Sequence, residues 1–247
     1  MHTDSPKTSG GYYKFLNIQY GEPPIGDLRI TRSIPHQTKR SVINIGSLEC
    51  VCPQSNPFWL AVGGRWLSHY ENSTTFPFEQ TSETLLTSKY SALVLPEPED
   101  PRISEDCLYL DVMVPQKIFD GAPNPTRSKN SSGASLFVWI YGGGYTSGSK
   151  EGVGNPAGLI KVAGMANGEG VVYVAMNYRL GAFGGISGPS LSASQSLALQ
   201  WVQENIHLFG SDPNRVTVMG DSAGAGSVVF QITAYGGTKD PYCSNNP

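Results

Sequence analysis

Residues 216–224 read Val-Thr-Val-Met-Gly-Asp-Ser-Ala-Gly, the segment of the chain that is most informative about its fold. The apolar residues before Gly220 predict a short strand, and the small residues after Gly224 predict a helix that ends near Gly236. Glycines on both sides of Ser222 let the strand turn abruptly into the helix, which leaves the serine hydroxyl exposed at the turn. This context favours a nucleophile elbow built around Ser222 over an ordinary glycine-rich turn.

The chain before the elbow alternates between predicted strands and helices. Leu136–Tyr141 (LFVWIY) and Val171–Met176 (VVYVAM) are continuous apolar runs, typical of strands buried on both faces. Leu108–Val114 alternates like a further strand, and Leu197–Phe209 has helical spacing. This order favours an α/β fold with a parallel sheet and right-handed crossovers. Residues 12–40, in contrast, are rich in turn residues and are expected to be irregular.

A second glycine motif, Gly142-Gly143-Gly144, follows the Leu136–Tyr141 run. A flexible loop or a tight turn would account for it. The alternative is an oxyanion hole, because backbone N–H groups can stabilise the negative charge that acyl transfer builds on a carbonyl oxygen. That role requires glycine, since a side chain would block the approach of the oxygen. Together with Ala223, the residue after the candidate nucleophile, this loop matches the usual source of the two donors.

Composition places the chain among globular proteins with many loops. Of its 247 residues, 39% are hydrophobic and only 15% are charged, where roughly 25% is typical. The net charge of −3 offers no basic surface for nucleic acid. No apolar run approaches the ~20 residues of a membrane span. The four cysteines are not spaced like metal ligands, and we expect neither a metal nor a cofactor.

The features that bear on the cellular compartment conflict. Residues 1–10 are polar and lack the apolar core of a signal peptide, so the chain is expected to be cytoplasmic if it begins at Met1. Two Asn-x-Ser/Thr acceptors, Asn72 and Asn130, are candidate glycosylation sites and indicate a secretory origin. Such triplets also arise by chance.

Long and specific segments run along the whole chain: YKFLNIQYGEPPIGDLRI (13–30), CPQ (52–54), SEDCLYLDVMVP (104–115), VWIYGGGYTSGS (138–149), VAMNYRLGAFG (174–184), LALQWVQENIHLFGSDPNRVTV (197–218) and GDSAGAGSV (220–228). These segments resemble the type B carboxylesterase and cholinesterase-like lipase family, and its fungal members above all. The family is typically secreted. The resemblance implies an α/β-hydrolase fold, one partial domain over residues 1–247, and hydrolysis of a small-molecule or lipid carboxylic ester.

Carried over position by position, the resemblance assigns catalytic roles. Ser222 resembles the family nucleophile, and Gly143, Gly144 and Ala223 resemble the oxyanion donors. Asp221 stands where the family has an acidic residue beside the serine. It either tunes the electrostatics of the site or is a solvated turn residue.

The same resemblance implies two structural pairs. Cys52 and Cys107 resemble the first disulfide of the family, which would leave Cys50 and Cys243 free. Such a bridge stabilises a fold by about 3–4 kcal/mol. Arg29 and Glu105 look like an ion pair near the same loop.

The resemblance breaks after the elbow. A serine hydroxyl needs a base to take its proton, and this fold supplies its partners in the order Ser, Asp or Glu, His. Residues 223–247 contain one acid, Asp240, and no histidine. We therefore expect a fold truncated after the elbow helix: a mixed, mostly parallel sheet that lacks its C-terminal strands. Residues 1–11 are expected to be disordered, and 238–247 form a divergent tail.

The histidines before the elbow offer no obvious base. His207 precedes the elbow strand and should lie about 20 Å from Ser222, at the opposite end of the sheet. His69 lies between Cys52 and Cys107, in a region whose path the sequence does not predict.

A second departure concerns a buried charge. Ser194-Gln195-Ser196 replaces the Asp-Gln-Arg of the family, so Arg179 loses the aspartate with which its counterpart pairs. Three hypotheses follow: a carboxylic-ester hydrolase, a catalytically inactive truncated remnant, and a non-catalytic interaction protein. The sequence does not determine the oligomeric state.

Overall fold

The computed structural model describes residues 11–37, 50–55, 58–87, 100–121, 133–152, 155–166, 170–185 and 191–237. Within these ranges the centre of the molecule is a five-stranded sheet in the order β1-β2-β4-β3-β5. Its strands are β1 (Tyr12–Gln19), β2 (Tyr109–Pro115), β3 (Ala134–Ile140), β4 (Val171–Met176) and β5 (Ser211–Gly220).

The sheet is mixed. β3 pairs in parallel with β4 and with β5, whereas β2 pairs antiparallel with β1 and with β4. The antiparallel share is therefore larger than the sequence indicated. Because β3, β4 and β5 run the same way, the loops that follow them meet at the carboxyl ends of these strands, where ligands bind in open α/β folds. β5 is an outermost strand of the described sheet, and β1 is the other.

The expectation that residues 12–40 are irregular was wrong for β1. Its pairing with β2 shifts register between Phe15 and Ile18, and Asn17 adopts a φ of 54° there. The N–H of Asn17 donates to Asp111 Oδ1 at 2.8 Å, and Lys150 Nζ donates to the other oxygen of that carboxylate at 2.8 Å. The buried ion pair between Asp111 and Lys150 thus stabilises a β-bulge at Asn17. This polar residue interrupts the apolar pattern of the strand, which is why the sequence did not predict β1.

The core lies on both faces of the central strands. β4 is buried along almost its full length, as its apolar run predicts. β3 differs from prediction, because Leu136, Val138 and Ile140 are buried while the residues between them are only partly covered. Full burial of one such aliphatic side chain contributes roughly 1.5–3 kcal/mol.

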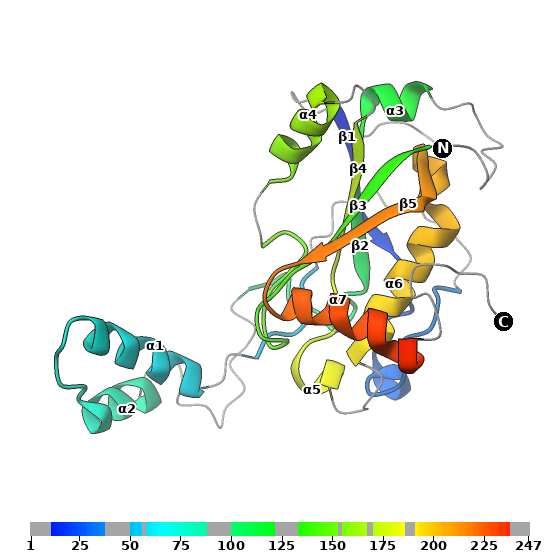
Figure 1. Cartoon of the computed structure of the whole chain (residues 1–247). Coiled ribbons are helices and arrows are strands. Elements are labelled where there is room, and N and C mark those ends of the chain that lie inside the picture. The colour runs from blue at the N-terminus through cyan, green and yellow to red at the C-terminus, as the bar shows by residue number, and fades with distance from the viewer. Residues whose placement is uncertain are drawn as a thin grey trace.

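Helices flank the sheet (Figure 1). α6 and α7 pack against one another and against β5, whereas α1 and α2 lie apart from the sheet. None of the helices in the described ranges has the length and hydrophobicity needed to cross a bilayer. The α-helices are α1 (Phe58–Glu71), α2 (Phe78–Thr87), α3 (Gln116–Gly121), α4 (Ala157–Ala166), α5 (Gly181–Gly185), α6 (Leu191–Asn205) and α7 (Ala223–Thr233), and 3-10 turns cover Gly26–Leu28, Ile206–Phe209 and Ala234–Gly237.

Candidate active site

Ser222 occupies a sharp turn between β5 and α7. Its φ of 47° and ψ of −119° form a backbone conformation that non-glycine residues rarely adopt and that costs of order 1–3 kcal/mol. The flanking glycines allow the turn: a Cβ on Gly224 would lie 2.1 Å from the carbonyl oxygen of Ile140, and one on Gly220 would lie 2.7 Å from it. The elbow therefore packs directly on the end of β3, and Ser222 itself is exposed.

The Gly142-Gly143-Gly144 loop lies against the elbow. A Cβ on Gly142 would be 3.0 Å from the Cβ of Ser222, so the two motifs that the sequence separates by almost eighty residues are in contact. The loop then turns back on itself, since the carbonyl of Gly143 accepts the N–H groups of Thr146 and Ser147 at 3.1 Å each. Glycine is required at Gly143, where φ is 102° and a Cβ would lie 2.1 Å from the carbonyl oxygen of Ser147.

Asp221 connects these two motifs. Its Oδ1 accepts the N–H of Gly142 at 2.7 Å, while its backbone carbonyl accepts the N–H groups of Gly224 and Ala225 in the first turn of α7. The side chain is exposed to solvent but is bonded to the loop. Asp221 is therefore more than a solvated turn residue: it attaches the start of the glycine loop to the elbow.

Three backbone N–H groups near the serine have no acceptor within the described part of the chain. They belong to Gly143, Gly144 and Ala223. Ala223 is the first residue of α7, so its N–H lies at the positive end of the helix. Such groups can receive a negatively charged oxygen without first breaking an internal bond. The N–H of Gly142, in contrast, is already used by Asp221.

Two tyrosines that the sequence did not single out support the same end of β3. The hydroxyl of Tyr178 donates to the carbonyl of Tyr141 at 2.6 Å, the hydroxyl of Tyr141 donates to the carbonyl of Tyr178 at 3.2 Å, and their rings stack at 4.3 Å. Burial raises the pKa of both hydroxyls, so they stay protonated and act as donors. The only signal in the sequence was that each tyrosine directly follows a strand or lies two residues beyond it.

The disulfide and the ion pair are both present. Cys52 and Cys107 are bonded and fully buried, and Cys50 is free, while Cys243 lies outside the described residues. Arg29 Nε lies 2.5 Å from Glu105 Oε2, and this hydrogen bond raises the pKa of the arginine.

Only one of the two candidate glycosylation sites lies within the described residues. Asn72 is exposed just after α1, and its Nδ2 donates to the carbonyl of Ser68 at 2.7 Å. Asn130 lies outside the described residues.

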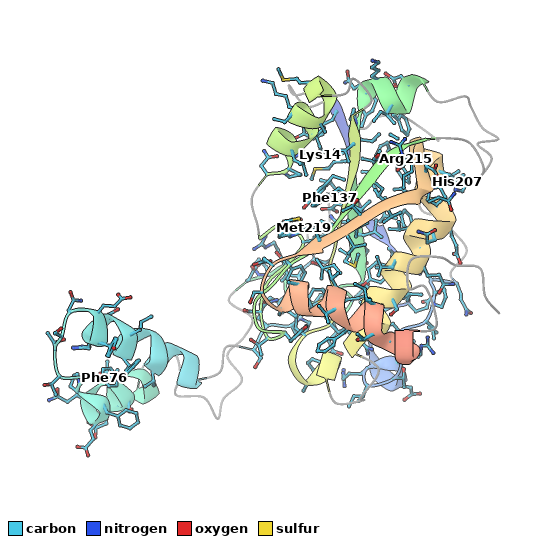
Figure 2. All side chains as sticks on the ribbon, in the orientation of Figure 1. Lys14, Phe76, Phe137, His207, Arg215 and Met219 are labelled. Carbon is cyan, nitrogen blue, oxygen red and sulfur yellow. A yellow bond between two sulfur atoms is a disulfide. The ribbon has the colours of Figure 1, made fainter. Side chains whose placement is uncertain are left out.

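None of the histidines within the described ranges lies beside Ser222. His207 precedes β5 whereas Ser222 follows it, and Figure 2 shows His207 near Arg215, at the end of β5 opposite Met219. His69 packs on Phe76, which Figure 2 shows apart from the sheet. His36 lies 3.4 Å from Glu22, which follows β1, and β1 and β5 are the two outermost strands of the described sheet.

Arg179 carries the unpaired buried charge that the replacement of Asp-Gln-Arg predicts. It is 2% exposed, and Nη1 donates to the carbonyl of Arg29 at 3.2 Å, but Nε and Nη2 have no partner in the described structure. Burial lowers the pKa of the guanidinium. Ser194, at the position of the family aspartate, is also fully buried with an unpartnered hydroxyl.

Comparison with solved structures places this architecture among known esterases. The structure of EstA from Aspergillus niger matches with a TM-score of 0.64 and 26% sequence identity, over 96% of this chain and 37% of that one. The juvenile hormone esterase of Manduca sexta matches in fold with a TM-score of 0.63. The chain therefore has an α/β-hydrolase fold, of which it covers part.

Comparison with known sequences leads to the same family. The chain is 41% identical to "Carboxylesterase patB" of Aspergillus clavatus, in an alignment that covers 95% of this chain and 44% of that protein. It is 38% identical to an acetylcholinesterase of Danio rerio, over 88% of this chain and 29% of that protein. The chain thus spans less than half the length of these relatives. The model of the "Carboxylesterase family" matches residues 2–239. By this match and by its fold, the chain belongs to the carboxylesterase family.

Proposed function

We propose that the chain supplies the nucleophile and the oxyanion donors of a serine hydrolase that cleaves small-molecule or lipid carboxylic esters. The observation that carries the proposal is the contact between the elbow and the glycine loop. Gly142 abuts Ser222 and is bonded to Asp221, and the N–H groups of Gly143 and Gly144, which follow Gly142, and of Ala223, which follows Ser222, have no acceptor among the described residues.

In the proposed mechanism, Ser222 Oγ attacks the carbonyl carbon of the ester and gives its proton to a base. The carbonyl oxygen becomes an oxyanion, which the N–H groups of Gly143, Gly144 and Ala223 stabilise. Removal of one such donor typically costs about 10²–10³ in kcat. Collapse of the intermediate expels the alcohol, which takes up the proton, and leaves an acyl group on Ser222. Water then attacks the acyl carbon and gives a proton to the base, and the second oxyanion collapses, releases the carboxylic acid and expels Ser222 Oγ, which takes up that proton.

The proposal assigns the base to a group other than the described histidines. His207, His69 and His36 are all held elsewhere, by position and by their own contacts. The same observation favours the alternative, in which this chain binds a partner or ligand without turnover. The two proposals differ in whether Ser222 reacts once a base is present.

An imidazole rescue experiment tests the proposal. The 247-residue chain and its Ser222→Ala variant are compared in hydrolysis of p-nitrophenyl acetate, over a range of imidazole concentrations. Without imidazole we expect equal rates, since removing triad members leaves only residual catalysis. With imidazole as the external base, the unmodified chain should become faster than the variant. The variant corrects for the reaction of imidazole with the ester.

Each other outcome has a clear meaning. A difference between the two proteins without imidazole would show that a group of this chain acts as the base, and would overturn the expectation that the chain alone has only residual activity. Equal rates at every imidazole concentration would reject Ser222 as a nucleophile and favour the non-catalytic alternative.

A further inference from the structure

The loop that begins at Gly142 ends at Gly148, and the side chain of Gln54 binds it there. The N–H of Gly148 donates to Gln54 Oε1 at 2.6 Å, and Gln54 Nε2 donates to the carbonyl of Gly148 at 3.0 Å. The side-chain amide of Gln54 thus binds both the N–H and the carbonyl of Gly148, as the backbone of a paired β-strand would. The N–H of Ser55 adds a bond to the carbonyl of Thr146 at 2.7 Å.

The segment that carries Gln54 is itself fixed on several sides. Cys52 is bonded to Cys107, and its carbonyl accepts a second bond from Gln54 Nε2 at 2.7 Å. Val51 bonds through its backbone to Arg102 and Ser104. Because the disulfide and the backbone bonds hold this segment, Gln54 is a rigid support rather than a mobile side chain on a loop.

Gly148 transmits this support to the site. Its φ is 111°, and a Cβ there would lie 2.6 Å from Tyr141 Cδ2 and 2.9 Å from the carbonyl oxygen of Gly142. Gly148 therefore packs directly against the residue at which the loop begins. A displacement of Gly148 would move Gly142, which contacts Ser222.

We infer that Gln54 is a positioning residue for the oxyanion hole, and that it couples the Cys52–Cys107 segment to the site. Asp221 holds the start of the loop and Gln54 holds its end, so the N–H groups of Gly143 and Gly144 are fixed between two anchors. Preorganised donors work only if they are held to within about 0.5 Å of the productive position. The inference rests on the proposed function, because the position of these N–H groups matters only if they bind an oxyanion.

Amide hydrogen exchange of the full chain tests this inference. Gln54→Met removes the polar atoms but keeps much of the side-chain volume, and Gln54→Glu keeps only the acceptor for Gly148. We expect exchange of the hydrogen-bonded N–H groups of Gly142, Thr146 and Ser147 to rise by about tenfold in Gln54→Met and by less in Gln54→Glu, with β4 unchanged. Gln200→Met is the matched control, because Gln200 is exposed on α6 and bonds only to Glu204 among the described residues.

The segments in which hydrogen exchange becomes faster determine whether the inference holds. Faster exchange in both the loop and β4 would assign Gln54 a general structural role, and unchanged exchange in the loop would show that it holds nothing; either outcome overturns the inference. If Gln54→Met does not fold, the comparison rests on Gln54→Glu. In the imidazole-dependent assay, the Gln54 variants should lower kcat with little change in KM. Exchange does not involve the chemistry of Ser222, so failure of this inference is distinct from failure of the proposed function.

Discussion

Asp221 Oδ1 lies 2.7 Å from the backbone nitrogen of Gly142, so the acidic residue beside the candidate nucleophile holds the loop that faces it. The bond joins the two motifs on which the proposed function depends. It also removes Gly142 as an oxyanion donor and leaves Gly143, Gly144 and Ala223 for that role.

Two substitutions of Asp221 distinguish the effect of its hydrogen bond to Gly142 from the effect of its negative charge. Asp221→Asn keeps an oxygen that can accept the Gly142 N–H, whereas Asp221→Ala removes it. We expect the Ser222-dependent rate in imidazole to fall about tenfold or more in the alanine variant, the equivalent of one hydrogen bond. The asparagine variant should keep most of the rate. Equal losses in both variants would mean that the negative charge, and not the bond, is what the site requires.

A methyl group at Gly142 should disturb the site more than the fold. A Cβ there would lie 2.9 Å from two oxygens of Asp221 and 3.0 Å from Ser222 Cβ. Gly142→Ala is therefore expected to abolish the Ser222-dependent rate. Gly164→Ala is the control, since a Cβ there meets nothing within 4 Å, and alanine should stabilise α4 by about 0.5–1 kcal/mol. Full activity of Gly142→Ala would show that the loop is not held against the serine.

Restoring a carboxylate should compensate the charge of Arg179. Both Arg179 and Ser194 are buried with unpartnered polar atoms in the described structure, and the family resemblance pairs their positions. Ser194→Asp should therefore raise the free energy of unfolding by about 1–3 kcal/mol. In an Arg179→Met background the same change should destabilise the chain, because it would then bury an unpaired carboxylate. Chemical denaturation of the four proteins measures the coupling, and independent effects would rule out the pairing.

The stability of the chain should depend on pH through Asp106. Burial raises the pKa of Asp106, although a hydrogen bond from the Tyr109 hydroxyl opposes the shift. The folded state then binds the proton more tightly than the unfolded state. The resulting stabilisation is full below the ordinary value of 3.8 and is lost as the pH rises through the raised pKa. We expect Asp106→Asn to have the higher Tm at pH 7 and the difference to shrink towards pH 4.

Asp100 provides a control of opposite sign. Hydrogen bonds from Arg102 lower the pKa of Asp100 to about 2, so its contribution is present above the ordinary value of 3.8 and is lost as the pH falls through about 2. Asp100→Asn should therefore lower the Tm at pH 7. If both variants shift the Tm in the same direction, the change would reflect a general effect of net charge.

How far the sequence predicts this molecule depends on the range of the interactions. The elbow at Ser222 is predictable because its glycines, its strand and its helix are adjacent in the chain. β1 was missed because it is interrupted at Asn17, whose backbone N–H donates to Asp111, ninety-four residues away. The hydrogen bonds between Asp221 and Gly142 and between Gln54 and Gly148 likewise join distant segments, so no local pattern in the sequence predicts them. Only family resemblance selected the pairing of Cys52 with Cys107, because spacing alone does not determine connectivity.

Covalent labelling tests most directly whether Ser222 is the nucleophile. The chain is incubated with a fluorophosphonate and imidazole, so that attack by Ser222 Oγ forms an oxygen–phosphorus bond, releases fluoride and passes the proton to imidazole. Intact mass and peptide mapping then locate the adduct. We predict one adduct per chain, on Ser222, which forms faster as the imidazole concentration increases and is absent from Ser222→Ala. Equal labelling of Ser222→Ala, or an adduct on another residue, would contradict it.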